Sequence, residues 1–180
     1  MTYAIRTFLL LLLVAQLFRS VELHAEELQL NELQLKPAIV YNIARYVTWP
    51  VSTNASHLEF TIGIYGQGRN TSMWNSLNGK SLQGRKISVR RFSDLDEIVN
   101  CNLLLIESSE RKNILRILAA VKDYPVLTIS EIDGFSHNGG MFTLHVINNR
   151  MAFEINLKSA RASGLTISSN ILKLAIEVLQ

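Results

Sequence analysis

Cysteine is almost absent from this 180-residue chain, because Cys101 is the only one. No disulfide bond can therefore form within the chain, and zinc sites built on paired cysteines are excluded. Cys101 lies just before the apolar run Leu103–Ile106, which predicts a buried thiol that packs as a small hydrophobic side chain. An intermolecular disulfide stays open as the alternative.

The chain also lacks an apolar run of membrane-spanning length. The longest one, Phe8–Phe18, is an almost unbroken run of 11 residues, whereas a membrane helix needs about 20. With Arg6 before it and the small residue Ala25 after it, the run predicts a secretory signal peptide over residues 1–25 and a mature domain over residues 26–180. A buried N-terminal helix and an uncleaved anchor are the alternatives.

No strong charge of either sign is present. The chain has 18 basic and 15 acidic residues, a net charge of +3. Removal of residues 1–25 takes away two arginines and one glutamate, which leaves 16 basic and 14 acidic residues and a net charge of +2. Because the basic residues are scattered along the chain, this balance gives no indication of nucleic-acid binding.

Motifs for catalysis are missing too. The chain has no G-x-S-x-G, no H-E-x-x-H and no carboxylate pair that stands out, and the mature histidines His57, His137 and His145 have no metal-ligand spacing. We therefore expect no enzymatic activity, no cofactor and no metal. Gly66-x-Gly68 follows a predicted strand and could bind a phosphate or nucleotide, but the third glycine of a dinucleotide motif is absent.

Apolar periodicity predicts an α/β fold. Val40, Ala44 and Val47 recur at helical spacing in Leu35–Pro50, and Ile39, Ile43 and Tyr46 widen the same stripe. A lead-in helix over residues 26–34 should precede it. Four strands are expected, at Glu59–Tyr65, Lys86–Phe92, Asn102–Glu107 and Pro125–Ser130.

Short helices should connect these strands, capped by Asn70 or Thr71, by Ser93 before Leu95–Val99, and by Ser108 or Ser109 before Ile114–Val121. A hairpin of Gly140–Val146 and Arg150–Ile155, joined through Asn148–Asn149, should follow. Asn156 can cap a helix over Leu157–Ser163 with Gly164 at its end. Ser168 or Ser169 can cap a last helix that runs through Val178. The expected architecture is one layered domain: a mainly parallel sheet of about four strands flanked by helices, plus a C-terminal antiparallel hairpin.

One polar face stands out in the hairpin. Arg150, Glu154 and Asn156 share a face of the second strand, because side chains alternate along a strand, and Arg161 follows on the next helix. Either this face is solvated and deters edge-to-edge pairing, or it forms a network that shapes a pocket or a partner surface. We expect Arg161 to be the partner of Glu154.

Six blocks of the sequence, in this order, resemble the YfiR family of bacterial periplasmic proteins. They are YNIARYVTWP (Tyr41–Pro50), FTIGIYG (Phe60–Gly66), GKSLQGRKISVR (Gly79–Arg90), CNLLLI (Cys101–Ile106), PVLTISEIDGFSHNGG (Pro125–Gly140) and the segment Arg150–Leu174 with F-E-I-N-L and A-R-x-S-G-L. The chain departs from the family at Pro37 and in its single cysteine, since some members carry several cysteines.

The resemblance implies a periplasmic regulator rather than an enzyme. Family members bind the periplasmic domain of an inner-membrane diguanylate cyclase and hold it inactive, which lowers cyclic di-GMP and biofilm formation. Such a protein would touch the membrane only through its partner, and a homodimer stays open. The competing hypothesis is a periplasmic module that binds a small ligand or nucleotide at the Gly66–Gly68 loop.

Overall fold

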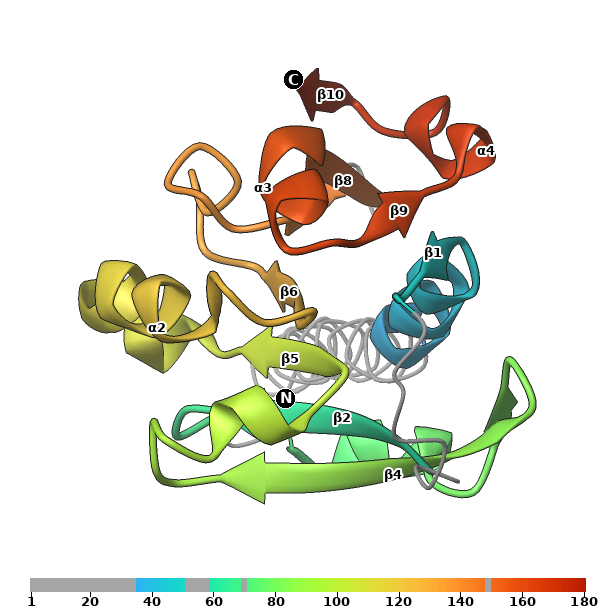
Figure 1. Cartoon of the computed structure of the whole chain (residues 1–180), viewed down its shortest axis with the longest axis vertical. Helices are drawn as coiled ribbons and strands as arrows, with labels where there is room; N and C mark the ends of the chain where they lie inside the picture. The colour runs from blue at the N-terminus through green and yellow to red at the C-terminus, as the bar shows by residue number, and fades with distance from the viewer. Residues whose placement is uncertain (1–34, 51–58, 69–70, 148–149) are drawn as a thin grey trace, which may run out of the picture. The chain divides into compact units, whose positions relative to one another are not determined.

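The computed structural model describes residues 35–50, 59–68, 71–147 and 150–180. The predicted signal peptide, the lead-in helix and the Asn148–Asn149 turn lie outside these residues. The chain divides into a unit of residues 1–36 and a compact unit over Pro37–Gln180, which is a mixed α/β domain (Figure 1). Among the described residues, no helix has the length and apolar character needed to cross a membrane.

The compact unit is built on one curled sheet of eight strands in the order β10-β8-β7-β6-β5-β2-β4-β3. The strands are β2 Glu59–Tyr65, β3 Ser81–Leu82, β4 Arg85–Phe92, β5 Leu103–Ile106, β6 Leu127–Ser130, β7 Phe142–Ile147, β8 Arg150–Asn156 and β10 Glu177–Leu179. Strands β4, β2, β5, β6 and β7 run parallel, and β8 returns antiparallel to β7. The expected mainly parallel sheet with a C-terminal hairpin is therefore confirmed.

The strand order reverses between β2 and β5. β2 is the first of the parallel strands along the chain, and it lies between the second, β4, and the third, β5. In open α/β sheets, ligands bind at such a reversal, beyond the carboxyl ends of the two strands. The Gly66–Gly68 loop follows β2 and therefore lies at this switch point.

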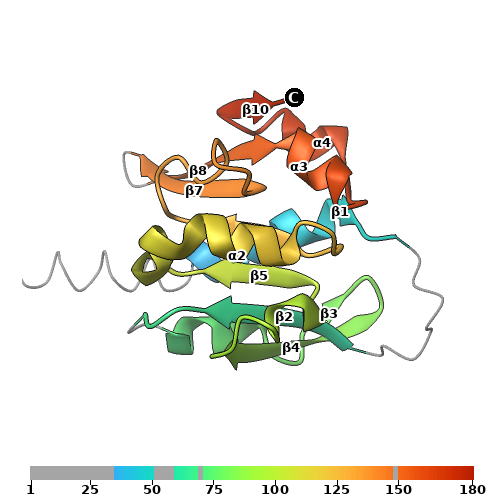
Figure 2. The ribbon, with the colours of Figure 1, turned by 60° about the vertical axis from the view of Figure 1, so that its left-hand side comes forward.

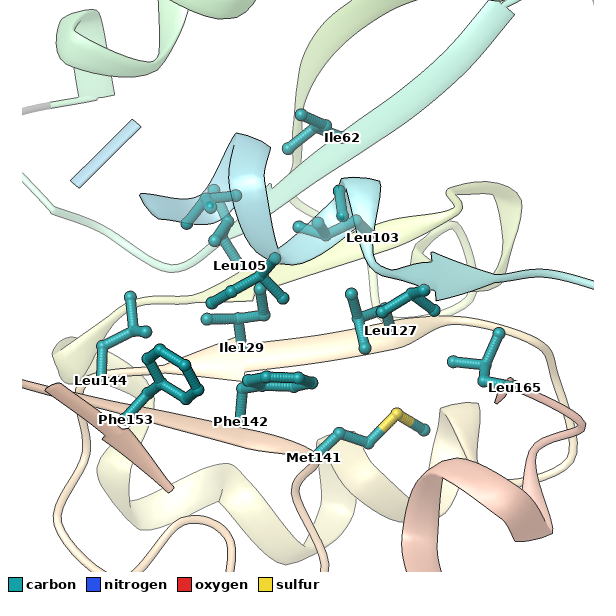
Figure 3. Packing of buried hydrophobic residues seen from close by; sticks show 14 of the residues in the cluster. Ile62, Leu103, Leu105, Leu127, Ile129, Met141, Phe142, Leu144, Phe153 and Leu165 are labelled. Carbon is teal, nitrogen blue, oxygen red and sulfur yellow. The ribbon is translucent and has the colours of Figure 1, made fainter. Parts of the chain in front are cut away.

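Helices cover both faces of the sheet, as Figure 2 shows. Alternate side chains divide between two cores: Leu103 and Leu105 join the core under the N-terminal helix, whereas Leu104 and Ile106 join the core under α2 (Ile114–Val121). All four residues of β5 are buried, which confirms the expectation of a strand covered on both sides. Figure 3 shows the first core, where the rings of Phe142 and Phe153 pack with centroids 6.0 Å apart.

The N-terminal helix is helical from residue 35, where the description begins, to residue 45. Val40, Ala44 and Val47 are fully buried, as their spacing predicts. Tyr46 is exposed, contrary to expectation, because the helix has ended and the chain enters β1 (Val47–Thr48), which pairs with β9 (Thr166–Ile167). Trp49 then donates its indole N–H to the Asn102 carbonyl at 3.0 Å, which fixes this segment against the sheet.

The connecting helices lie where they were predicted, but several are 3-10 helices and one is shorter than expected. Thr71–Leu77 is a 3-10 helix (η1), and the helix expected over Leu95–Val99 is reduced to the 3-10 turn Ile98–Asn100 (η2), without a side-chain cap. Ser108–Asn113 also forms a 3-10 helix (η3) ahead of α2, and neither expected serine caps it. The Ser109 hydroxyl instead accepts the Gln67 N–H at 2.9 Å, so a long-range contact replaces the local one.

The C-terminal segment contains one confirmed helix and one wrong prediction. α3 (Leu157–Ala162) is capped by the Asn156 side chain, which accepts the Ser159 N–H, and Gly164 follows it with a φ of +75°. The last helix, α4, covers only Ser169–Leu172. Residues 173–176 turn the chain, and Glu177–Leu179 then forms edge strand β10, because pairing with β8 satisfies backbone groups that a helix would have satisfied internally.

Candidate functional site

The polar face predicted on the hairpin is present on β8. Phe153 and Ile155 point into the core, so Glu154 and Asn156 lie on the opposite face. The loop of residues 131–140, which follows β6, packs against that face through Ser136. We call this group of side chains the hairpin network: Ser136, Thr143, His145, Glu154 and Asn156.

Glu154 is the centre of the hairpin network, with 13 % of its side chain exposed. Its Oε2 accepts the Ser136 hydroxyl, and its Oε1 lies 2.9 Å from His145 Nε2. The Ser136 hydroxyl also lies 2.6 Å from that of Thr143, and the Ser136 carbonyl accepts the Asn156 side-chain N–H at 2.7 Å. These contacts join the loop to β7 and β8.

The environment favours the ionised form of Glu154. Burial of the carboxyl group raises its pKa, but hydrogen bonds from Ser136 and His145, the electrostatic attraction of His145 and a hydrogen bond from Thr143 lower it more. The pKa of Glu154 therefore lies below its ordinary value. The network holds a carboxylate in a fixed position beneath the surface.

Two more titratable side chains complete this region. His137 Nε2 lies 3.4 Å from Glu177 Oε2, and about half of each side chain is exposed. Glu177 opens β10, where it is the register partner of Glu154 on β8. The ligand atoms of His137, Glu154 and Glu177 lie within 4.8 Å of one another. The sequence spacing of the histidines gave no sign of this, because the sheet brings the three together.

The structure gives Glu154 different partners from the one predicted. Arg161 is exposed in the last turn of α3, and the groups that contact the Glu154 carboxylate come from Ser136 and His145. Arg150 is exposed at the start of β8, four residues along the strand from Glu154. Of the four candidate residues, Glu154 and Asn156 are joined through Ser136, whereas the two arginines lie outside the hairpin network.

The Gly66–Gly68 loop at the switch point is closed by protein groups. The Gly68 N–H donates to the Glu107 carboxylate, which pairs with Arg91 through both oxygens at 3.1 and 3.2 Å. Arg91 also donates to the Gly66 carbonyl. A side chain at Gly68 would require the Glu107 carboxylate to move away from the loop.

This arrangement disfavours a phosphate at the loop. The Glu107 carboxylate occupies the position where the loop N–H groups would meet a phosphate, and it would repel that group. A pocket between α2 and α3, lined by Leu118, Met141 and Ser159 among others, has a volume of about 110 Å³. Ligand pockets usually measure roughly 300–1,000 Å³, so neither feature favours the small-ligand hypothesis.

Three members of the hairpin network, Ser136, Thr143 and His145, were missed from the sequence. Ser136 lies in a polar loop and His145 on a strand, 18 and 9 residues from Glu154. The Thr143–Glu154 register would have been the signal for Thr143, since opposite residues of an antiparallel pair share a face. Ser136 had no comparable signal, because its position depends on how the loop folds back.

Comparison with known proteins identifies the family. Two solved structures, a conserved domain protein from Vibrio cholerae O1 biovar El Tor strain N16961 and an ABC domain in complex with L-Trp from Streptococcus pneumoniae, share 10 % and 13 % identity, each with a TM-score of 0.48. They cover 66 % and 67 % of this chain, which spans just over half of their length, 54 % and 56 %. The YfiR/HmsC-like family model matches residues 33–176. The chain therefore belongs to the YfiR/HmsC-like family.

Proposed function

We propose that this protein is a periplasmic regulator that binds the periplasmic domain of an inner-membrane diguanylate cyclase and holds the enzyme inactive. The family match over residues 33–176 is the observation that carries this proposal. To inhibit the enzyme, the protein needs only a higher affinity for the inactive cyclase than for the active one. To shift the ratio of inactive to active cyclase from 1:99 to 99:1, the protein must bind the inactive state roughly 10⁴-fold more tightly than the active state.

We place the partner surface at the end of the hairpin. Val146 and Ile147 are exposed there, and Arg150 lies opposite Ile147 in the antiparallel register. Exposed aliphatic side chains beside an arginine form the kind of patch that interfaces bury, since arginine is enriched in them. Glu154 and Asn156 support this strand from the hairpin network. Arg161 is exposed on α3, which follows the other end of β8, so it lies outside this surface.

The test measures binding and inhibition together. Purified mature protein is titrated against the periplasmic domain of a diguanylate cyclase encoded in the same genome, and cyclic di-GMP is measured in cells that express both full-length proteins. Ile147→Glu should weaken binding by about 30-fold, as expected for a residue that contributes about 2 kcal/mol to an interface. Cyclic di-GMP should rise accordingly, and Arg150→Glu should act in the same direction.

Leu115→Glu provides the matched control. Leu115 is an exposed leucine on α2, 68 % exposed, and lies outside the hairpin. It should leave both binding and inhibition unchanged. Equal effects of Ile147→Glu and Leu115→Glu would exclude the hairpin end as the interface, and a wild-type protein that neither binds nor inhibits any cyclase of its genome would refute the regulator itself.

A further inference from the structure

Three side chains with metal-binding chemistry meet beside the edge strand of the sheet. His137 comes from the loop after β6, Glu154 from β8 and Glu177 from β10. Their ligand atoms all lie within 4.8 Å of one another. No two of them are close in sequence, so the cluster exists only in the folded domain.

The two carboxylates face each other across neighbouring strands. Glu154 and Glu177 are register partners in the parallel pair β8-β10, so their side chains project from the same face. Like charges placed directly opposite each other destabilise a sheet. Positive charge between them removes that repulsion, and His137, 3.4 Å from Glu177, lies beside that space.

The set of donors suits a transition metal of the zinc class. Zn²⁺ binds imidazole nitrogen and carboxylate oxygen at roughly 2.0–2.2 Å, so neighbouring ligands of a tetrahedral site lie roughly 3.3–3.5 Å apart. The His137–Glu177 separation of 3.4 Å already has this value. The ligand atoms of all three residues lie within 4.8 Å of one another. Because the side chains of His137 and Glu177 are about half exposed, they can move the short distance that brings them and Glu154 to ligand spacing around one ion.

The hairpin network supplies the support that metal ligands require. Glu154 is contacted by Ser136 at Oε2, by His145 at Oε1 and also by Thr143. A carboxylate offers about four lone-pair sites, so a coordination site remains on Glu154. Such outer partners fix the orientation of a ligating carboxylate and raise its affinity for the metal.

We propose that His137, Glu154 and Glu177 form a binding site for a divalent transition metal such as Zn²⁺. Water completes the coordination, because the three protein ligands leave one tetrahedral position open. The metal ties β10, a strand of three residues, and the loop of residues 131–140 to β8.

The experiment uses the mature chain without a histidine tag. Zn²⁺ is titrated by calorimetry, and Co²⁺ is titrated by its visible absorption, which reports tetrahedral ligation. Wild-type protein should bind one ion per chain. His137→Gln and Glu177→Gln should each weaken binding at least about 100-fold, since even the loss of an outer partner costs roughly 10–100-fold. Zn²⁺ should also slow hydrogen exchange of the β10 backbone in the wild type but not in Glu177→Gln.

Two matched variants test whether the effect is specific. Asp133→Asn removes an exposed carboxylate from the same loop as His137. His57→Gln removes a mature histidine that belongs neither to the cluster nor to the hairpin network and lies outside the described residues. Both should bind Zn²⁺ as the wild type does, and circular dichroism should show all four variants folded. Absence of a stoichiometric ion in the wild type, or an equal loss of affinity in His57→Gln and His137→Gln, would overturn the proposed site.

Discussion

Replacing Glu154 by glutamine should destabilise the domain in a pH-dependent way. Glutamine keeps the size of the side chain but removes the charge that the Ser136 hydroxyl and His145 Nε2 contact. The substitution therefore changes the electrostatics of the hairpin network with little change in packing.

Two opposing effects decide the size of the loss. Hydrogen bonds to charged groups contribute about 1.5–3 kcal/mol, compared with about 0.5–1.5 kcal/mol for neutral ones, and Glu154 has two such partners. The variant also removes the repulsion between Glu154 and its register partner Glu177, which is worth up to about 1 kcal/mol. The hydrogen bonds outweigh the repulsion, and we expect a net loss of about 1–3 kcal/mol at pH 7.

The assay is urea denaturation of both proteins between pH 7 and pH 3. The pKa of folded Glu154 is lowered from 4.5, so its contribution to the free energy of unfolding is fully present above the unfolded pKa. That contribution disappears as the pH falls through the folded pKa. The difference between wild type and Glu154→Gln should therefore be constant near neutrality and shrink at acidic pH.

Glu59→Gln is the control, because Glu59 forms an ion pair with Arg90 in which both side chains are more than half exposed. It should reduce the free energy of unfolding by less than about 1 kcal/mol. A difference between wild type and Glu154→Gln that stays constant down to pH 3, or a variant as stable as the wild type at pH 7, would refute the reasoning.

Three further predictions concern other parts of the chain. Burial raises the pKa of Cys101 to about 12, so native protein should react slowly with a thiol reagent and show the same mass with and without reductant; rapid labelling or a disulfide-linked dimer would contradict this. Gly68→Ala should lower the free energy of unfolding by about 1–3 kcal/mol in urea, because the new methyl group displaces the Glu107 carboxylate from Arg91 and the loop N–H; an unchanged midpoint would exclude the closed loop. Periplasmic protein should have the intact mass of residues 26–180, whereas a membrane-bound species that retains residues 1–25 would indicate an anchor.

The regular elements were predictable where the pattern of the sequence and the tertiary environment agree. The alternation in Glu59–Tyr65 and the continuous apolar run Leu103–Ile106 predicted β2 and β5, because half-buried and fully buried strands leave different patterns. The prediction of the last helix was wrong because the pattern of the sequence and the tertiary environment disagree there. Glu177–Leu179 is too short to show alternation, and pairing with β8 overrides its helical spacing.

The site was only half predictable. Period-two alternation placed Glu154 and Asn156 on one face of β8, but it could not give Glu154 its partners. The prediction of Arg161 assumed that a cation on the following helix would meet the carboxylate, whereas the folded loop supplies the Ser136 hydroxyl. Glu177 joined the cluster through β10, the element that the sequence pattern failed to predict.

In the closed Gly66–Gly68 loop at the switch point, the Glu107 carboxylate competes with any anionic ligand for the loop N–H groups. An anion can bind the loop N–H groups only in molecules from which the carboxylate has withdrawn, and the measured affinity falls in proportion to that fraction. If the pairing with Arg91 and Gly68 favours the closed form by about 3 kcal/mol, a value typical of charge-assisted hydrogen bonds, fewer than about 1 % of molecules are open. A crevice with an intrinsic Kd of about 1 µM would then be half-occupied only at roughly 0.2 mM ligand, so the domain can keep a crevice at its strand-order reversal and still leave dilute anions unbound.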